Sequence, residues 1–153
     1  MFLKILFLFV IVVPFVGKSQ HIDKLNTIVN QWHLAASKAD LAEYTKPMSD
    51  KFVFLGTAPG ERWKKDAFIS FSKPYFDKGK AWDFKPSNRI WEFNADSTIA
   101  WFDEELDTWM KGCRGAGIMV KEKESWKISY YNLTVLIENE KIKPFIELRE
   151  SNK

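Results

Sequence analysis

Residues 98–109 read TIAWFDEELDTW, residues 114–121 read RGAGIMVK, and residues 126–137 read WKISYYNLTVLI. β-Branched and aromatic residues are frequent in all three runs, as they are in β-strands. The glycines at 112, 115 and 117 surround the first reversal, and a polar segment, KEKES, forms the second. Strand-like runs separated by such short turns predict an antiparallel meander, which is the centre of the fold.

The chain before this meander is predicted to supply helices and further strands. Residues 21–39 repeat apolar side chains every three or four positions, which indicates one buried helix face: Ile22, Leu25, Val29, Trp32 and Ala36. Asp40 caps a shorter helix over 41–45, which Pro47 ends. A strand over 51–55, a helix over 64–78 and a long bent strand over 81–94 follow. The sum is an α+β fold, in which helices pack on one concave face of a four- to five-stranded antiparallel sheet.

The first 19 residues have the pattern of a secretory signal peptide. Lys4 precedes an apolar run over 5–16, and the segment ends with small residues at Gly17 and Ser19. This run is shorter than the ~20 apolar residues that span a bilayer. We therefore predict cleavage between Ser19 and Gln20 and a periplasmic or secreted protein, with an uncleaved membrane anchor as the alternative. The chain then divides into a signal peptide (1–19), one domain (20–140) and a C-terminal tail (141–153).

The charge balance and the cysteine count argue against several kinds of partner. Loss of Lys4 and Lys18 with the signal leaves 21 of the 23 basic residues against 20 acidic ones. A nearly neutral chain without basic blocks offers no footprint for nucleic acid, and no membrane association is expected after signal removal. The sequence has no spaced set of metal ligands and no phosphate-binding glycine loop, so neither a metal nor another cofactor is expected. Cys113 is the only cysteine, so it is either buried in the sheet or free to link two chains.

Aromatic residues make up 16% of the chain, with 7 Trp and 13 Phe. They indicate either a core of large side chains or a pocket lined with aromatic rings. Aromatic side chains give a pocket an apolar surface and lose little conformational entropy. Alternation in the last strand places one row on a predicted pocket wall: Trp126, Ile128, Tyr130, Asn132 and Thr134. The other row ends in Tyr131, Leu133 and Val135, and we expect it to form a homodimer surface. The candidate ligand-binding residues are Trp32, Trp63, Tyr75, Trp101, Arg114, Tyr130 and Asn132.

Three side chains are candidates for acid–base chemistry, namely Asp103, His33 and Glu61. Both faces of the acidic strand carry carboxylates, so alternation alone does not decide which of Asp103, Glu104 and Glu105 is internal. Desolvation in an aromatic cavity would raise the pKa of such a carboxyl group and make it a base. His33 is either a core residue or a pocket group, and Glu61 either caps the following helix or points into the cavity.

Several segments, taken in order, match one known pattern: Trp32-His33 with Ala36 and Asp40, Phe54-Leu-Gly-Thr57 with Glu61-Arg-Trp63, Ala100-Trp-Phe-Asp-Glu104, Arg114-Gly115 with Gly117, and Trp126-Lys-Ile128 with Tyr131, Leu133, Thr134 and Asn139. This set resembles the SnoaL-like domains of the nuclear transport factor 2-like superfamily over residues 22–139. The resemblance implies a cone-shaped barrel, whose curved sheet wraps around the helices and leaves a pocket at the open end. It also implies frequent dimerisation through the outer face of the sheet.

The resemblance implies no single activity, since relatives include isomerases, cyclases, dehydratases and binding modules. Ala58 and Asn132 stand where relatives often carry Asp and His, so a proton acceptor is missing at both positions. We therefore expect binding of a small apolar or amphipathic molecule in an aromatic-lined pocket. One alternative is a cofactor-independent isomerase or lyase that acts next to a carbonyl, with a pocket carboxylate as base and His33, Tyr130 or Arg114 stabilising the anion. The other alternative is a dimerising interaction module without a ligand.

Overall fold

The computed structural model describes residues 16–151. In chain order its elements are α1 (Val16–Ser37), α2 (Leu41–Thr45), β1 (Met48–Leu55), β2 (Arg62–Lys64), α3 (Lys65–Asp77), β3 (Lys85–Phe93), β4 (Ile99–Thr108), β5 (Lys111–Glu122), β6 (Ser125–Val135), the 3₁₀ turn η1 (Asn139–Lys141) and α4 (Ile142–Glu150). Residues 1–15 of the predicted signal peptide lie outside the described residues, and the predicted cleavage point between Ser19 and Gln20 falls within α1. The signal peptide and its cleavage stay predictions.

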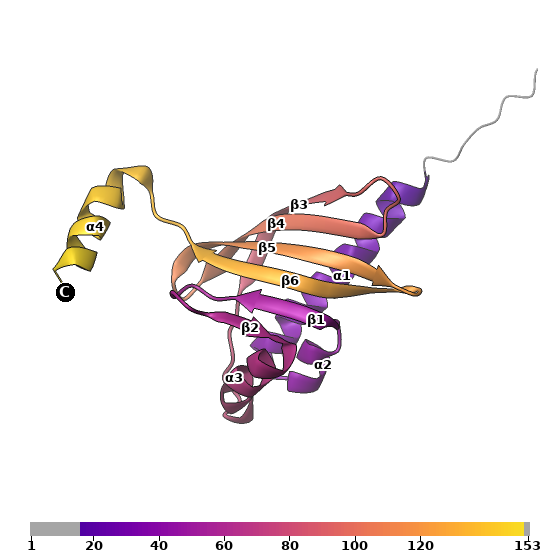
Figure 1. The fold of residues 1–153 in the computed structure, drawn as a ribbon, viewed down its shortest axis with the longest axis horizontal. Coiled ribbons are helices and arrows are strands. Elements are labelled where there is room, and N and C mark those ends of the chain that lie inside the picture. The colour runs from indigo at the N-terminus through magenta and orange to yellow at the C-terminus, as the bar shows by residue number, and fades with distance from the viewer. Residues whose placement is uncertain (1–15, 152–153) are drawn as a thin grey trace, which may run out of the picture.

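Six strands form one curved sheet in the order β2-β1-β6-β5-β4-β3 (Figure 1). β1 and β6 run parallel, and all other neighbouring strands are antiparallel. The expected sheet of four to five antiparallel strands is therefore corrected in strand number and in the direction of one pair. β2 and β3 are edge strands, so the cone implied by the resemblance is an open, curved sheet and not a closed barrel.

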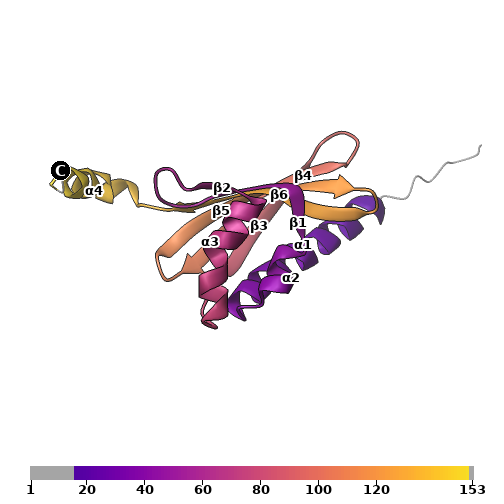
Figure 2. The same cartoon turned by 60° about the horizontal axis from the view of Figure 1, so that its bottom comes forward.

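The helices α1, α2 and α3 all lie on one face of the sheet, as Figure 2 shows from the side. The apolar stripe predicted on α1 is largely buried, with Leu25 and Val29 fully enclosed and Trp32 2% exposed. Trp32 stacks on Tyr44 of α2, with ring centroids 5.0 Å apart, and meets Tyr131 of β6 edge-on at 4.8 Å. The α+β class, with helices packed on one face of the sheet, is confirmed.

A β-bulge in β6 reverses the predicted alternation of that strand. Met119 of β5 pairs with Ile128, but its neighbour Ile118 pairs with Tyr130, so β6 carries one extra residue between the two pairs. An extra residue shifts every later side chain to the opposite face. The buried row is consequently Trp126, Ile128, Tyr131 and Leu133, while Tyr130 and Asn132 face away from the helices. The predicted pocket row and the predicted dimer row are both wrong beyond residue 128, because the bulge exchanges their faces.

The chain after β6 leaves the body of the molecule. η1 and α4 lie beyond the end of the sheet in both views (Figure 1, Figure 2). All residues of α4 are exposed, and this helix falls within the predicted C-terminal tail. In residues 16–151 no helix combines the length and apolar character needed to cross a membrane. Cys113 is 1% exposed, so of the two alternatives that the sequence left open it is the thiol buried in the sheet.

Candidate functional site

A cavity of about 390 Å³ opens where the loop after β1, helix α3 and the β4–β5 turn meet. The lining residues come from five separate parts of the chain: Phe54, Gly56, Thr57, Glu61, Trp63, Phe68, Phe71, Tyr75, Ala81, Trp82, Phe84, Trp109, Met110 and Leu133. Most of these side chains are aromatic or aliphatic, and we call this cavity the aromatic pocket.

Helix α3 supplies one wall of the aromatic pocket. Phe68, Phe71 and Tyr75 lie three and four residues apart, which places them along one helix face. Trp63 of β2 stacks on Phe71 with ring centroids 4.5 Å apart. Tyr75 then contacts Trp82 of the segment that follows α3, with centroids 6.3 Å apart. These rings pack against one another, so the wall is held in place by its own contacts.

Glu61 supplies the carboxylate of the aromatic pocket. Its Oε2 accepts a hydrogen bond from the Ala58 backbone N–H at 3.0 Å. The carboxylate packs directly on Gly56, where an added Cβ would overlap Oε2 and lie 3.0 Å from the Glu61 Cβ. Glu61 does not cap α3, whose N-cap is Lys64. Of the two positions left open by the sequence, Glu61 therefore occupies the one in the cavity.

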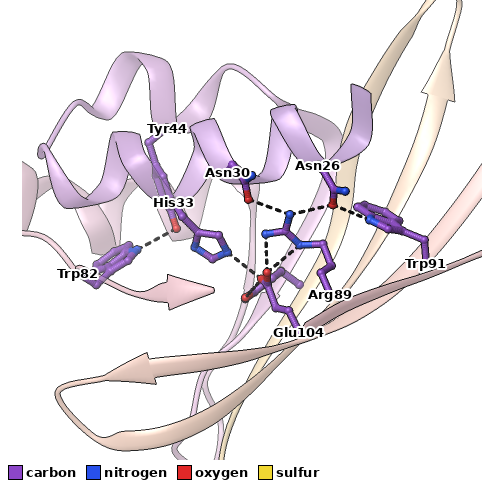
Figure 3. A network of polar contacts seen from close by, with 9 residues as sticks. Asn26, Asn30, His33, Tyr44, Trp82, Arg89, Trp91 and Glu104 are labelled. Atoms are coloured by element: carbon purple, nitrogen blue, oxygen red, sulfur yellow. Dashed lines mark hydrogen bonds and ion pairs between the residues drawn. The ribbon is translucent and has the colours of Figure 1, made fainter. Parts of the chain in front are cut away.

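A second polar cluster lies in the core between α1 and the sheet (Figure 3). His33 Nε2 of α1 lies 2.7 Å from Glu104 Oε1 of β4, and the Tyr131 hydroxyl donates to the same oxygen at 2.8 Å. Arg89 of β3 donates to Glu104 Oε2 from Nε at 2.9 Å and from Nη2 at 2.6 Å. Asn26 and Asn30 of α1 accept from Arg89 Nη1, and Asn26 also accepts from the Trp91 indole at 2.8 Å.

The neighbours of Glu104 keep its carboxyl group ionised. Burial by itself would raise the pKa of Glu104, but the hydrogen bond and charge of His33, with Arg89 and Tyr131, lower the pKa below its usual value. Burial, followed by the charge of Glu104, raises the pKa of Tyr131 well above its usual value. Tyr131 therefore remains a hydrogen-bond donor to a carboxylate whose two oxygens are both occupied.

The polar cluster around Glu104 contacts residues that line the aromatic pocket but does not line the pocket itself. Phe84 lines the pocket, and its ring centroid lies 6.4 Å from that of His33. Phe54 lines the same wall and stacks on Tyr131 at 5.9 Å. His33 and Glu104 are 5% and 0% exposed, and neither contributes to the pocket lining. The imidazole and carboxylate thus form a buried pair next to the cavity and not inside it.

The structure brings three of the predicted site residues together in the aromatic pocket, namely Glu61, Trp63 and Tyr75. Trp32 and His33 are core residues. The remaining five lie on the outer face of the sheet, away from the helices: Trp101, Asp103, Arg114, Tyr130 and Asn132. Burial of Phe102, Glu104 and Leu106 turns the odd-numbered residues of β4 outward, so the expectation that Asp103 is an internal base is corrected.

Sequence reasoning left Glu104 undecided among the three carboxylates of its strand and missed Arg89. The signal for Glu104 was present, because Ala100, Phe102 and Leu106 share its row and set the phase of β4. Arg89 carried no such signal, since only the pairing of β3 with β4 brings it to the carboxylate. In residues 16–151 no group of three His, Cys, Asp or Glu side chains is placed to hold a metal ion.

Comparison with known proteins identifies the family. Residues 25–138 match the SnoaL-like domain, and the chain belongs to this family, as the ordered motifs indicated. The comparison with curated proteins gave no match.

Solved structures share the fold at low sequence identity. A domain of unknown function with a cystatin-like fold from Nostoc punctiforme PCC 73102 aligns with a TM-score of 0.70 and 16% identity, over 88% of each chain. A nuclear transport factor 2-like protein of unknown function from Pseudomonas putida KT2440 gives 0.67 and 11%, over 80% of this chain and 92% of that one. A nuclear transport factor 2-like protein from Cytophaga hutchinsonii ATCC 33406 gives a TM-score of 0.62 and 16% identity, over 75% of this chain and 98% of that one. These likenesses establish the nuclear transport factor 2-like fold.

Proposed function

We propose that this protein binds a small apolar or amphipathic organic molecule in the aromatic pocket. The observation that carries the proposal is an open cavity of about 390 Å³ whose walls are mostly aromatic rings. This volume falls within the roughly 300–1,000 Å³ of small-molecule sites, which are typically apolar with a few polar groups that orient the ligand. Glu61 and Thr57 are the polar side chains available for that purpose beside the Tyr75 hydroxyl.

A cofactor-independent isomerase or lyase is the second candidate function, and His33–Glu104 is the pair that would carry its chemistry. A general base must reach the proton that it removes, directly or through one water. Glu104 is saturated by His33, Tyr131 and Arg89, and neither His33 nor Glu104 lines the pocket. The pocket residue Phe84 contacts His33, and the pocket residue Phe54 contacts Tyr131. The lowered pKa of Glu104 also makes it a weak base. The geometry therefore supports binding better than acid–base catalysis.

Export and dimerisation complete the proposal. We place the mature protein in the periplasm or outside the cell, on the strength of the leader pattern in residues 1–19. We place a homodimer contact on the outer sheet face, where strand register aligns Trp101, Ile118 and Tyr130 in one row. Trp101 is 44% exposed and Ile118 37% exposed, which leaves apolar area for a second copy to cover.

Native mass spectrometry of protein purified gently from its own source tests the binding proposal. We expect a small molecule that stays with the folded protein and is lost on denaturation. Titration of that molecule should then show at least tenfold weaker binding to Trp63→Ala, a loss of about 1.4 kcal/mol. Trp101→Ala is the matched control, because it removes an indole that does not line the pocket. Equal binding by both variants would contradict the assignment of the pocket.

A further inference from the structure

We propose that the aromatic pocket selects an organic cation, meaning an amine or quaternary ammonium group carried on an apolar body. This inference rests on the proposed binding function and names the chemical class of its ligand. It follows from the charge of the pocket wall and from the chemistry of its rings.

The pocket wall is anionic. Among the described residues that line it, Glu61 is the only charged side chain, and no lysine, arginine or histidine is present. Its Oε2 is used by the Ala58 N–H, whereas Oε1 makes no hydrogen bond within the described part of the chain. A ligand can therefore neutralise this carboxylate without displacing a partner. A neutral ligand leaves the charge uncompensated, and an anionic ligand is repelled by it.

The two lysines of helix α3 are directed elsewhere. Lys65, at the start of α3, donates to the Met48 carbonyl at 3.2 Å and to Asp50 at 3.1 Å. Lys73, further along the same helix, pairs with Asp77 at 2.7 Å. Neither lysine lines the pocket. Both cations of α3 are thus held by acids outside the cavity, and neither of them pairs with Glu61.

The rings favour the same class of ligand. Aromatic faces carry the negative part of a quadrupole and attract alkylammonium groups, Trp most strongly. Trp63, Phe71, Tyr75 and Trp82 form a continuous series of ring contacts, with successive centroids 4.5, 5.6 and 6.3 Å apart. Phe71 and Tyr75 are 37% and 48% exposed, so part of this aromatic surface is free to contact a ligand. Rings and carboxylate in one cavity combine cation–π attraction with charge pairing.

The test compares two ligands of the same shape that differ in charge. Phenyltrimethylammonium and tert-butylbenzene are isosteric, and binding of each can be followed by tryptophan fluorescence or calorimetry. We expect the cation to bind at least tenfold more tightly than the hydrocarbon at low ionic strength. In Glu61→Gln the ratio of the two affinities should fall toward one. Asp103→Asn, which removes a carboxylate from the outer sheet face, is the matched control and should keep the ratio.

The outcomes separate this inference from the proposed function. If tert-butylbenzene binds as tightly as the cation, cation selection is wrong while the apolar pocket stands. If Glu61→Gln keeps the preference, the assignment of that selection to the Glu61 carboxylate is wrong while the apolar pocket stands. If neither ligand binds up to the solubility limit of the hydrocarbon, both proposals are wrong. A preference that depends on Glu61 and not on Asp103 supports both.

Discussion

Both oxygens of the Glu104 carboxylate are used by side chains from three other elements, α1, β3 and β6. A carboxylate that is fully buried must be paired and hydrogen-bonded, since desolvation of an isolated charge is costly. His33, Arg89 and Tyr131 meet that requirement together. Each of the three also gains a partner for its own buried polar atoms, so the cluster joins the first helix to both halves of the sheet.

Glu104→Gln should destabilise the protein by about 3–5 kcal/mol, because it leaves the buried Arg89 guanidinium without its counter-charge. The free energy of unfolding in urea measures this change. Asp103→Asn is the control, since it alters the adjacent carboxylate on the exposed face and should shift stability by no more than about 0.5 kcal/mol. If both variants change the free energy of unfolding by a similarly small amount, the Glu104–Arg89 ion pair makes no net contribution to stability.

The stabilising effect of Glu104 should disappear in acid. Its pKa is lower in the folded protein than in the unfolded chain, so its ionised form favours folding above the unfolded value of about 4.3. This contribution is lost as the pH falls through the lower folded value. Unfolding measured from pH 6 to pH 3 should show the difference between wild type and Glu104→Gln shrinking toward acid. A difference that stays constant with pH would contradict this assignment.

At the scale of elements, two glycines of β5 leave space on the inner face of the sheet, which large side chains from the neighbouring strands β4 and β6 fill. Gly115 and Gly117 lie on the face of β5 that looks toward the helices. A Cβ at Gly115 would overlap the Tyr131 hydroxyl and lie 3.1 Å from Glu104 Cγ, and a Cβ at Gly117 would overlap the Phe102 ring. The glycines therefore leave room for Tyr131 and Phe102 to fill the inner layer.

Gly115→Ala should cost about 1–3 kcal/mol, because the added methyl group displaces Tyr131 from Glu104. Thermal and urea unfolding measure the loss. Gly112→Ala is the matched control in the same strand, where an added Cβ has no atom within 4 Å, and it should be close to neutral. Equal stability of the two variants would mean that the core relaxes around residue 115 without cost.

At the scale of the whole molecule, the helices cover only one face of the sheet (Figure 2). The outer face keeps apolar side chains in register across β4, β5 and β6. Exposed apolar rows of this kind are commonly covered by a second copy in a two-fold dimer.

We expect the protein to sediment as a dimer and Trp101→Glu to sediment as a monomer, because a charge would replace the 44% exposed indole at the β4 end of the apolar row. Trp109→Glu is the control, since this 81% exposed indole lies in the β4–β5 turn, away from the outer row. Analytical ultracentrifugation distinguishes the two states. A wild-type monomer at high micromolar concentration would remove the dimer from the proposal.

The sequence by itself determined the layout of the elements. The 3.6-residue spacing on α1, the turn residues around the meander and the ordered motifs predicted an α+β domain of the SnoaL-like family, because these signals are local in the chain. They also included Trp63 and Tyr75 among the candidate ligand-binding residues, whereas Glu61 was left open between a helix cap and the cavity.

The tertiary structure alone decided which face each later strand residue occupies. One extra residue in β6 exchanged Tyr130 with Tyr131, and a bulge depends on pairing with β5 and not on the composition of β6. The parallel pairing of β1 with β6 and the meeting of Arg89 with Glu104 likewise join segments far apart in the chain. Such contacts depend on the packing of the whole core. Periodicity within one segment shows only which residues share a face of that helix or strand.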